Sequence, residues 1–188
     1  MHDPSFETLE TSRLTIRRFS DADARPFSAY RSDPEVARYQ GWESCSERDA
    51  HEFILSLKDL APGTPGRWFQ FAIEIKESGE LAGDCALHCP TEDERQGELG
   101  FTLARPYQRH GYATEAVGGL LEYAFMRLEL HRLHSITNER NYPAHRLLET
   151  LGFRIEGRFR ENTWFKGDWA SERHYAMLCE EWTARDET

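Results

Sequence analysis

The residues whose types and spacing most directly predict chemistry are residues 108–114, which read Gln-Arg-His-Gly-Tyr-Ala-Thr. Apolar residues at three-and-four spacing follow Gly111 and predict an amphipathic helix that begins there. The first N–H groups of a helix have no internal partner and lie at the positive end of the helix dipole, so they can hold a pyrophosphate. Gly111 lets the chain come close to such a ligand, and Ala113 keeps the next position small. This segment therefore predicts an anion site, to which Arg109 and His110 would add positive charge.

A glycine in front of a helix is also common in proteins that bind no anion, so a second motif is needed. Residues 138–144 read Asn-Glu-Arg-Asn-Tyr-Pro-Ala, and Leu147, Leu148 and the pair Gly152-Phe153 follow. This spacing predicts a short helix that Gly152 ends. The two motifs in this order are more specific than either alone.

Together these motifs resemble the GNAT superfamily of N-acetyltransferases, in the branch similar to ribosomal-protein alanine N-acetyltransferases of the RimJ and RimL type. The resemblance implies an α/β (α+β) fold with a mixed, mostly antiparallel central sheet of about seven strands flanked by about four helices. In this family the central strand carries a bulge, and the fourth and fifth strands splay apart to admit the thioester of acetyl-CoA, the cosubstrate. No metal is implied. The matching stretches are residues 9–14, 97–101 and 108–116, Asn141, residues 151–153 and residues 181–182.

The resemblance also implies which residues hold the cofactor. Backbone amides of residues 109–114 would grip the CoA pyrophosphate, residues 101–103 would pair with pantetheine, and Asn141 would hydrogen-bond the cofactor's arm. The fork of Arg146 suits the 3′-phosphate, although a solvated arginine is the competing interpretation. The expected cofactor-binding residues are Phe101, Thr102, Leu103, Gln108, Arg109, His110, Gly111, Tyr112, Ala113, Thr114, Asn141 and Arg146.

The acetyl transfer that the resemblance implies includes two proton transfers, one from the attacking amine and one to the departing thiolate, and each needs a candidate residue. An attacking amine must be neutral, and a lysine-like amine has an unperturbed pKa of about 10.4, so a base is required. Glu98 precedes the ligand-binding stretch on the same strand and is the candidate base; the alternative is a solvated carboxylate at a strand start. Ala144 and Leu148 occupy positions where related enzymes carry serine or tyrosine, so a dedicated acid for the thiolate is in doubt. Tyr142 is the candidate acid, and otherwise the thiolate leaves unprotonated or takes a proton from water.

The acceptor is expected to be a primary amine, either a protein N-terminus or a small molecule. Trp42 and Tyr39 are candidates to line its slot, although large aromatics more often fill cores or interfaces. Two other functions compete with the N-acetyltransferase hypothesis. The missing acid allows a noncatalytic acyl-CoA-binding sensor, and the acidic composition favours a small-molecule acetyltransferase acting on polyamines or antibiotics.

The elements that must position these residues follow from periodicity and turn signals. Alternating apolar residues predict strands, and the Glu-Ser-Gly-Glu stretch at residues 77–80 predicts a hairpin. Serines followed by aspartate three residues later predict two early capped helices. The expected order is a strand over residues 9–19, helices from residue 20 and over 51–60, strands over 68–75, 81–88 and 98–103, the long helix, a strand over 134–137, a helix over 143–151 and a strand pair over 153–178.

Composition limits the class of protein. A chain of 188 residues suits one domain over residues 1–188. Its net charge of −10 disfavours nucleic acid and anionic membranes as partners. No apolar run approaches the roughly 18 residues of a membrane span, and the N-terminus lacks a signal-peptide pattern, so a cytoplasmic location is expected.

The cysteines predict neither disulfides nor a metal site. Cys85, His88 and Cys89 lie close in sequence, but an extended segment places the two cysteines on one face and His88 on the other. All four cysteines are expected to be free thiols in a chain of this size. Aromatic residues on the late strands would suit a homodimer.

Overall fold

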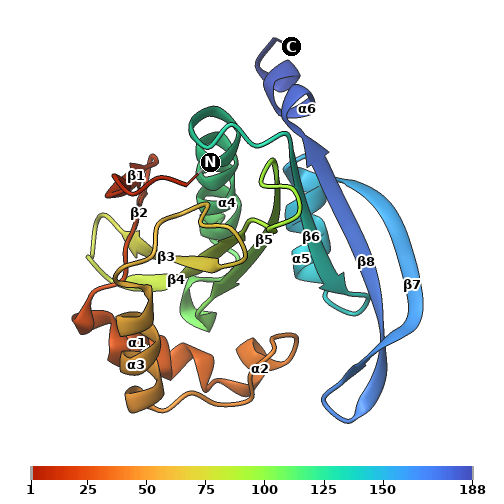
Figure 1. Ribbon diagram of the computed structural model, residues 1–188. Coiled ribbons are helices and arrows are strands. Elements are labelled where there is room, and N and C mark those ends of the chain that lie inside the picture. Colours follow the sequence, from red (N-terminus) through yellow and green to blue (C-terminus); the bar gives the residue numbers. More distant parts are fainter. Residues whose placement is uncertain (1, 188) are drawn as a thin grey trace.

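The computed structural model describes residues 2–187, which form one sheet flanked by helices (Figure 1). The strands are β1 (Thr8–Glu10), β2 (Leu14–Arg17), β3 (Trp68–Ile75), β4 (Leu81–His88), β5 (Gln96–Leu103), β6 (Arg132–Asn138), β7 (Arg154–Phe165) and β8 (Asp168–Leu178). The helices are α1 (Ala24–Arg31), α2 (Pro34–Ala37), α3 (Glu47–Leu57), α4 (Tyr112–Glu122), α5 (Tyr142–Thr150) and α6 (Cys179–Thr183). The strand order is β1-β2-β3-β4-β5-β6-β8-β7, and every pair is antiparallel except β5 and β6.

The mixed, mostly antiparallel α/β fold is confirmed, and the described residues contain eight strands instead of about seven and six helices instead of about four. The additional strand arises because the segment expected as one strand, residues 9–19, turns at Thr11, whose N–H donates to the Leu14 carbonyl at 2.9 Å. Of the additional helices, α2 is a single turn capped by Asp33, whose carboxylate accepts from the Glu35 N–H at 2.9 Å. The other, α6, follows β8.

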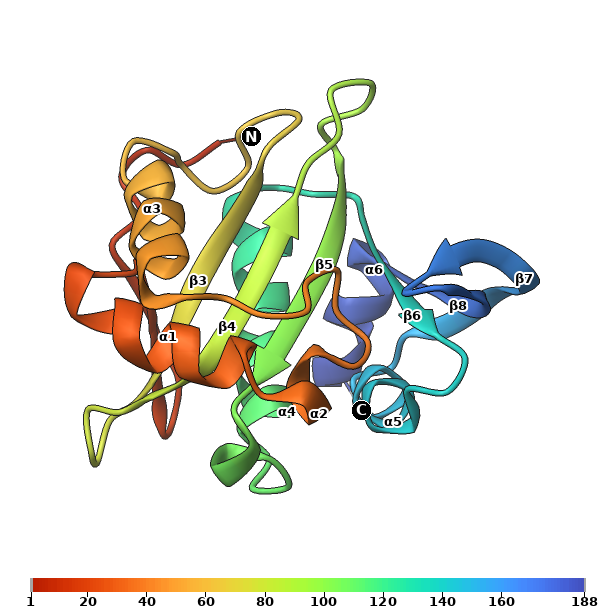
Figure 2. The ribbon, with the colours of Figure 1, turned by 90° about the horizontal axis from the view of Figure 1, so that it is seen from below.

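Helices cover both faces of the sheet, with α1 and α3 on one side of β3 and β4 and α4 on the other (Figure 2). Phe69, Phe71 and Ile73 point from β3 into the core beneath α4, whereas Ala72 points into the smaller core beneath α1 and α3. Successive side chains of a strand point to opposite faces, so a strand between two helical layers needs apolar residues on both.

The cysteines near the end of β4 and His88 lie on opposite faces of the sheet, as the alternation of an extended segment predicts. Cys85 and Cys89 are buried in the core beneath α4. His88 lies on the opposite face, where its ring stacks on Trp68 with the centroids 5.2 Å apart. The structure has Cys45, Cys85, Cys89 and Cys179 as unpaired thiols.

The sheet splits between β5 and β6. The two strands pair only from Gln96 with Arg132 to Glu98 with His134, and both strands continue beyond this point without pairing to each other. These are the fourth and fifth strands of the expected seven, so the predicted splay is confirmed. Just past the last paired residues, the Ser135 hydroxyl donates to the Leu99 carbonyl at 2.9 Å and marks the vertex of the split.

The prediction of a bulge in the central strand that splays is wrong for β5. Its register with β4 is regular from Gly83 opposite Leu103 to His88 opposite Glu98. The irregularity lies one strand away, where Ile73 of β3 faces Gly83 but the next residue faces Leu81. The split therefore forms because pairing with β6 ends, without a register shift in β5.

The long helix predicted after Gly111 is α4, which continues into a π turn over Tyr123–Arg127. Ala116, Val117 and Leu120 are fully buried and form the stripe that packs on the sheet. None of the helices within residues 2–187 combines the length and apolar character needed to cross a bilayer.

Candidate functional site

The topology brings the two predicted motifs together. Because β5 and β6 run parallel, their carboxyl ends lie at the same edge of the sheet, and each strand leads there into a helix, α4 and α5 respectively. The split opens toward that edge. Crevices outside the carboxyl ends of parallel strands are a recurrent place for ligands.

Unpaired backbone donors gather at the N-terminus of α4. Gly111 is the N-cap residue with φ of 81°, and Arg109 has φ of 64°, so the chain makes a left-handed turn before the helix. Within the described part of the chain, no N–H of residues 109–114 donates a hydrogen bond to the protein. The first N–H to do so is that of Glu115, which reaches the Gly111 carbonyl at 3.0 Å. This run of donors at the positive end of the helix is available to an anion.

Arg13, which the sequence analysis did not assign to the site, lies against this turn. Its Nη1 donates to the His110 carbonyl at 3.0 Å, and its Nε pairs with Glu115 at 2.7 Å. A Cβ atom added to Gly111 would lie 3.2 Å from Nη2 of Arg13, so the guanidinium adjoins the free amides. The only signal in the sequence is that Arg13 falls within the first stretch that resembles the family.

The end of β5 offers a ligand mainly its backbone. The side chains of Thr102 and Leu103 are buried, and that of Phe101 is half-buried. Nε2 of Gln40 lies 3.5 Å from the Phe101 carbonyl. Nε2 of Gln108 donates to the Leu103 carbonyl at 2.9 Å, so the predicted cofactor-binding side chain of Gln108 is occupied at the strand end.

At the start of α5, Asn141 is the N-cap residue, and its Oδ1 accepts from the Ala144 N–H at 3.4 Å. Its side-chain amide donor has no partner among the described residues and is free to bind a ligand. Arg146 is exposed on α5. Tyr142 is 63% exposed, and its ring meets His145 edge to face. The roles assigned to these residues stay predictions.

Glu98 occupies the vertex of the split, on the face that carries α1 and α3. It is the register partner of His88 on β4 and of His134 on β6. Burial raises the pKa of the Glu98 carboxyl above its usual value, although the nearby His88 and His174 oppose this shift. A half-buried carboxyl with a raised pKa beside a split sheet has the character of a general base.

Of the two predicted acceptor residues, Tyr39 borders a cavity of about 260 Å³ between the segment after α2 and the β7–β8 hairpin, and its hydroxyl donates to the Arg140 carbonyl at 3.0 Å. Trp42 packs beneath Arg31, whose guanidinium carbon is 3.8 Å from the indole centroid. At the hairpin tip, Nζ of Lys166 donates to the carbonyl of Ala37, the last residue of α2, at 2.9 Å and to that of Trp42 at 2.6 Å. Trp42 therefore supports the segment, and Tyr39 faces the cavity.

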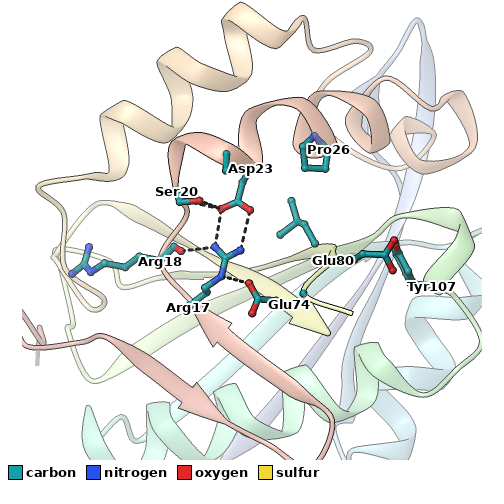
Figure 3. A pocket seen from close by; sticks show the side chains of 11 residues that line it. Arg17, Arg18, Ser20, Asp23, Pro26, Glu74, Glu80 and Tyr107 are labelled. Atoms are coloured by element: carbon teal, nitrogen blue, oxygen red, sulfur yellow. Dashed lines mark hydrogen bonds and ion pairs between the residues drawn. The ribbon is translucent and has the colours of Figure 1, made fainter. Parts of the chain in front are cut away.

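A larger cavity of about 620 Å³ lies where β2, β3 and α1 meet (Figure 3). Arg17 donates to both carboxylate oxygens of Asp23, at 2.7 and 2.9 Å, and to Glu74 at 2.7 Å. Burial raises the pKa of Asp23, but hydrogen bonds from Arg17 and Ser20 outweigh it and hold that pKa below its usual value. Because these charges satisfy one another, we do not assign the reaction to this cavity.

The chain is similar to known proteins over most of its length. Residues 13–154 match the family model described as an acetyltransferase (GNAT) domain. The chain is 32% identical over 177 residues to the uncharacterized N-acetyltransferase p20 of Bacillus licheniformis. This match covers 94% of this chain and 98% of that protein. It is 31% identical over 104 residues to the putative ribosomal N-acetyltransferase YdaF of Bacillus subtilis, or 55% of this chain and 57% of that protein. It is 26% identical over 175 residues to spermidine N(1)-acetyltransferase of Escherichia coli K12, or 93% of this chain and 91% of that protein.

Solved structures agree with the fold. A GNAT-family acetyltransferase from Bacillus anthracis superposes with a TM-score of 0.83 at 29% identity, over 93% of this chain and 99% of that chain. RimJ of Mycobacterium smegmatis, solved in complex with CoA-disulfide, superposes with a TM-score of 0.79 at 22% identity, over 96% of this chain and 91% of that chain. The second likeness concerns the fold alone.

Proposed function

Since this chain belongs to the GNAT acetyltransferases, with relatives in the RimJ/RimL-like branch, its cosubstrate is acetyl-CoA, and we propose that it acetylates a primary amine at the split between β5 and β6. The amine attacks the thioester directly, and Glu98 accepts the proton. The observation that carries this proposal is the run of free N–H groups at residues 109–114, beside the open edge of the split.

The cofactor is held by main-chain groups in this proposal. The amides of residues 109–114 bind the pyrophosphate, the free strand end at residues 101–103 pairs with pantetheine, and the free amide of Asn141 binds the arm. Arg13 adds a positive charge beside the phosphates. This arrangement supports binding because main-chain donors are fixed before the ligand arrives.

The position of Glu98 supports its role as base. A thioester placed in the split by its pantetheine would lie near the vertex, where Glu98 stands on the face carrying α1 and α3. The raised pKa moves this carboxyl closer to the pH at which it would accept and release a proton. A strand N–H would stabilise the oxyanion of the tetrahedral intermediate, a role worth about 3 kcal/mol elsewhere.

Departure of the thiolate needs no dedicated acid in this proposal. Ala144 and Leu148 are buried and carry no proton to give, and Tyr142 remains the candidate acid at the start of α5. The enzyme assignment does not depend on Tyr142, because a thiolate can leave unprotonated. The missing acid therefore gives little support to the sensor alternative.

Two acceptor classes stay within the proposal: a protein N-terminus, in keeping with the YdaF likeness, and a small polyamine, in keeping with the spermidine N(1)-acetyltransferase likeness. The cavity beside Tyr39 lies next to the split and has room for the part of the acceptor beyond its amine.

We also propose a single domain over residues 1–188, a cytoplasmic location, and a homodimer through the exposed Trp164 and Trp169.

The test compares wild type with Glu98→Gln, following thiol release from acetyl-CoA with peptides that begin with alanine or serine and with spermidine. We expect Glu98→Gln to lower kcat by about 100-fold or more, the range of general acid–base groups, while the Kd for CoA stays constant. In the wild type, kcat should fall as the pH decreases through the raised pKa of Glu98, because only the carboxylate is a base. CoA binding without thiol release from any acceptor would instead support a sensor, and an unchanged kcat would exclude Glu98.

A further inference from the structure

Glu98 lies between two histidines that the proposed acetyl transfer does not use. His88 faces it from β4 and His134 faces it from β6. Nε2 of His134 is 3.8 Å from Oε2 of Glu98, and both side chains are about one-quarter to one-third exposed, at 26% and 31%. His88 is instead engaged by its stack on Trp68. The two histidines are therefore not equivalent neighbours of the carboxyl.

The surroundings of His134 favour the neutral form of its imidazole. Burial lowers the pKa of His134, and Arg132 and the neighbouring His174 lower it further, against a backbone hydrogen bond at Gly97 and the charge of Glu156, which raise it. Nδ1 of His134 is buried, and a hydrogen bond with the Gly97 backbone acts on the ring. Because Nδ1 is buried, Nε2 is the ring nitrogen that can exchange a proton with Glu98 and with water.

We propose that His134 relays the proton that Glu98 removes from the acceptor amine to solvent, and so regenerates the carboxylate in each turnover. This inference rests on the proposed role of Glu98 as the base. His134 acts through Glu98 and is a positioning and relay residue, without contact to the acetyl group.

The proton balance of the relay is simple. The acceptor ammonium loses one proton to Glu98, which becomes a neutral carboxylic acid, and the free amine attacks the thioester. The nitrogen of the tetrahedral intermediate loses its second proton as the C–S bond breaks, and the departing thiolate takes up that proton, directly or through water. The acid then passes the proton to Nε2 of neutral His134, which leaves a carboxylate and an imidazolium. The imidazolium then releases that proton from Nε2 to water, since Nδ1 is buried. The 3.8 Å separation exceeds a direct hydrogen bond, so a small side-chain rotation or one water completes the path.

Charged groups on every neighbouring strand affect this pair. His88 faces Glu98 from β4, while His174 and Glu172 act from β8. Arg132 on β6 is paired with Glu156 on β7 at 2.5 Å, and this ion pair acts on His134. Because Glu98 must be ionised and His134 neutral, the acidic limb of the pH–rate profile should contain two ionisations that belong to the pair.

The experiment uses His134→Ala, which leaves a space for added imidazole, with His134→Gln as a variant of similar size. His88→Ala is the matched control, because it removes the histidine that faces Glu98 from the other neighbouring strand, β4. For His134→Ala we expect kcat to fall about tenfold, less than the roughly 100-fold expected for the base itself, with an unchanged Kd for CoA. Added imidazole should restore most of the rate, and the acidic limb should become less steep by one ionisation.

The outcomes separate a relay from a structural role. His88→Ala should keep the two-ionisation limb and show no response to imidazole. The relay would be overturned if folded His134→Gln kept both ionisations in the acidic limb of its pH–rate profile. It would also be overturned if added imidazole restored the rate of neither alanine variant, or of both His134→Ala and His88→Ala. If Glu98→Gln lowers kcat and the His134 variants do not, the relay alone is wrong; if Glu98→Gln has no effect, the proposed base is wrong as well.

Discussion

At the scale of the residue, Gly111 contributes a backbone conformation. Its φ of 81° lies in the left-handed region, which β-branched residues adopt only under strain. This conformation turns the chain into α4 so that the amides on either side of Gly111 stay unpaired. The neighbouring Arg13 guanidinium occupies the direction in which a side chain would project. Both the turn and the space beside it thus require glycine.

Replacing Gly111 with valine should therefore weaken CoA binding at least tenfold, because the side chain would strain the turn and displace Arg13. Calorimetric titration with CoA measures this loss. Gly79→Val is the matched control: Gly79 has φ of 70° in the β3–β4 hairpin, and nothing lies within 4 Å of its added Cβ. Both variants should lose about 1–3 kcal/mol of stability from strain, but only Gly111→Val should lose CoA. Equal CoA affinity in the two variants would mean that the pyrophosphate does not bind at the turn before α4.

At the scale of the element, the two halves of the split sheet meet through the β7–β8 hairpin and the segment after α2. Nζ of Lys166 donates to the carbonyls of Ala37 and Trp42, and the Tyr39 hydroxyl reaches the Arg140 carbonyl. These contacts bridge the mouth of the split on the face that carries Glu98. The hairpin thus closes one wall of the proposed acceptor site.

Lys166→Met should raise the KM for the acceptor about fivefold to tenfold, corresponding to the loss of hydrogen bonds from a charged donor worth about 1–1.5 kcal/mol. The Kd for CoA should stay the same, because the pyrophosphate site lies on other elements. Initial-rate kinetics with a varied acceptor measure the change. Lys58→Met, at the end of α3, is the control for loss of a lysine charge. A change in CoA affinity without a change in acceptor KM would contradict this role of the hairpin.

At the scale of the whole molecule, the net charge of −10 acts on both substrates. The acidic surface repels CoA at long range, so the local cation Arg13 and the free amides must offset that repulsion at the site. The same field attracts a cationic acceptor. Long-range attraction of this kind is screened by salt, with a Debye length of about 30 Å at 0.01 M and about 8 Å at 0.15 M.

The value of kcat/KM for spermidine should consequently fall several-fold between these two salt concentrations, because steering of a multiply charged acceptor weakens. A short peptide with one N-terminal charge should respond less and serves as the comparison. Steady-state rates at saturating acetyl-CoA measure both. A rise of kcat/KM for spermidine with salt would mean that the acceptor approaches through a positively charged region.

The sequence predicted those parts of the site that depend on neighbouring residues. The turn proposed to bind the pyrophosphate is local, because a glycine and the first helical amides lie within residues 109–114. The N-cap at Asn141 and most strands of the sheet follow from turn chemistry and alternation in the same way. The resemblance supplied the splay, but it also implied a bulge that β5 does not have.

Only the tertiary structure decided which residues meet across the split. Glu98 and His134 are distant in sequence, and they become partners because a short parallel register joins β5 to β6. Arg13 reaches Gly111 for a similar reason, since β2 and α4 pack on the same core. Strand register and helix packing depend on burial summed over many side chains, so no local pattern encodes them. The sequence by itself therefore predicts the free amides of the turn, whereas the neighbours of the proposed base Glu98 are determined by the folded molecule.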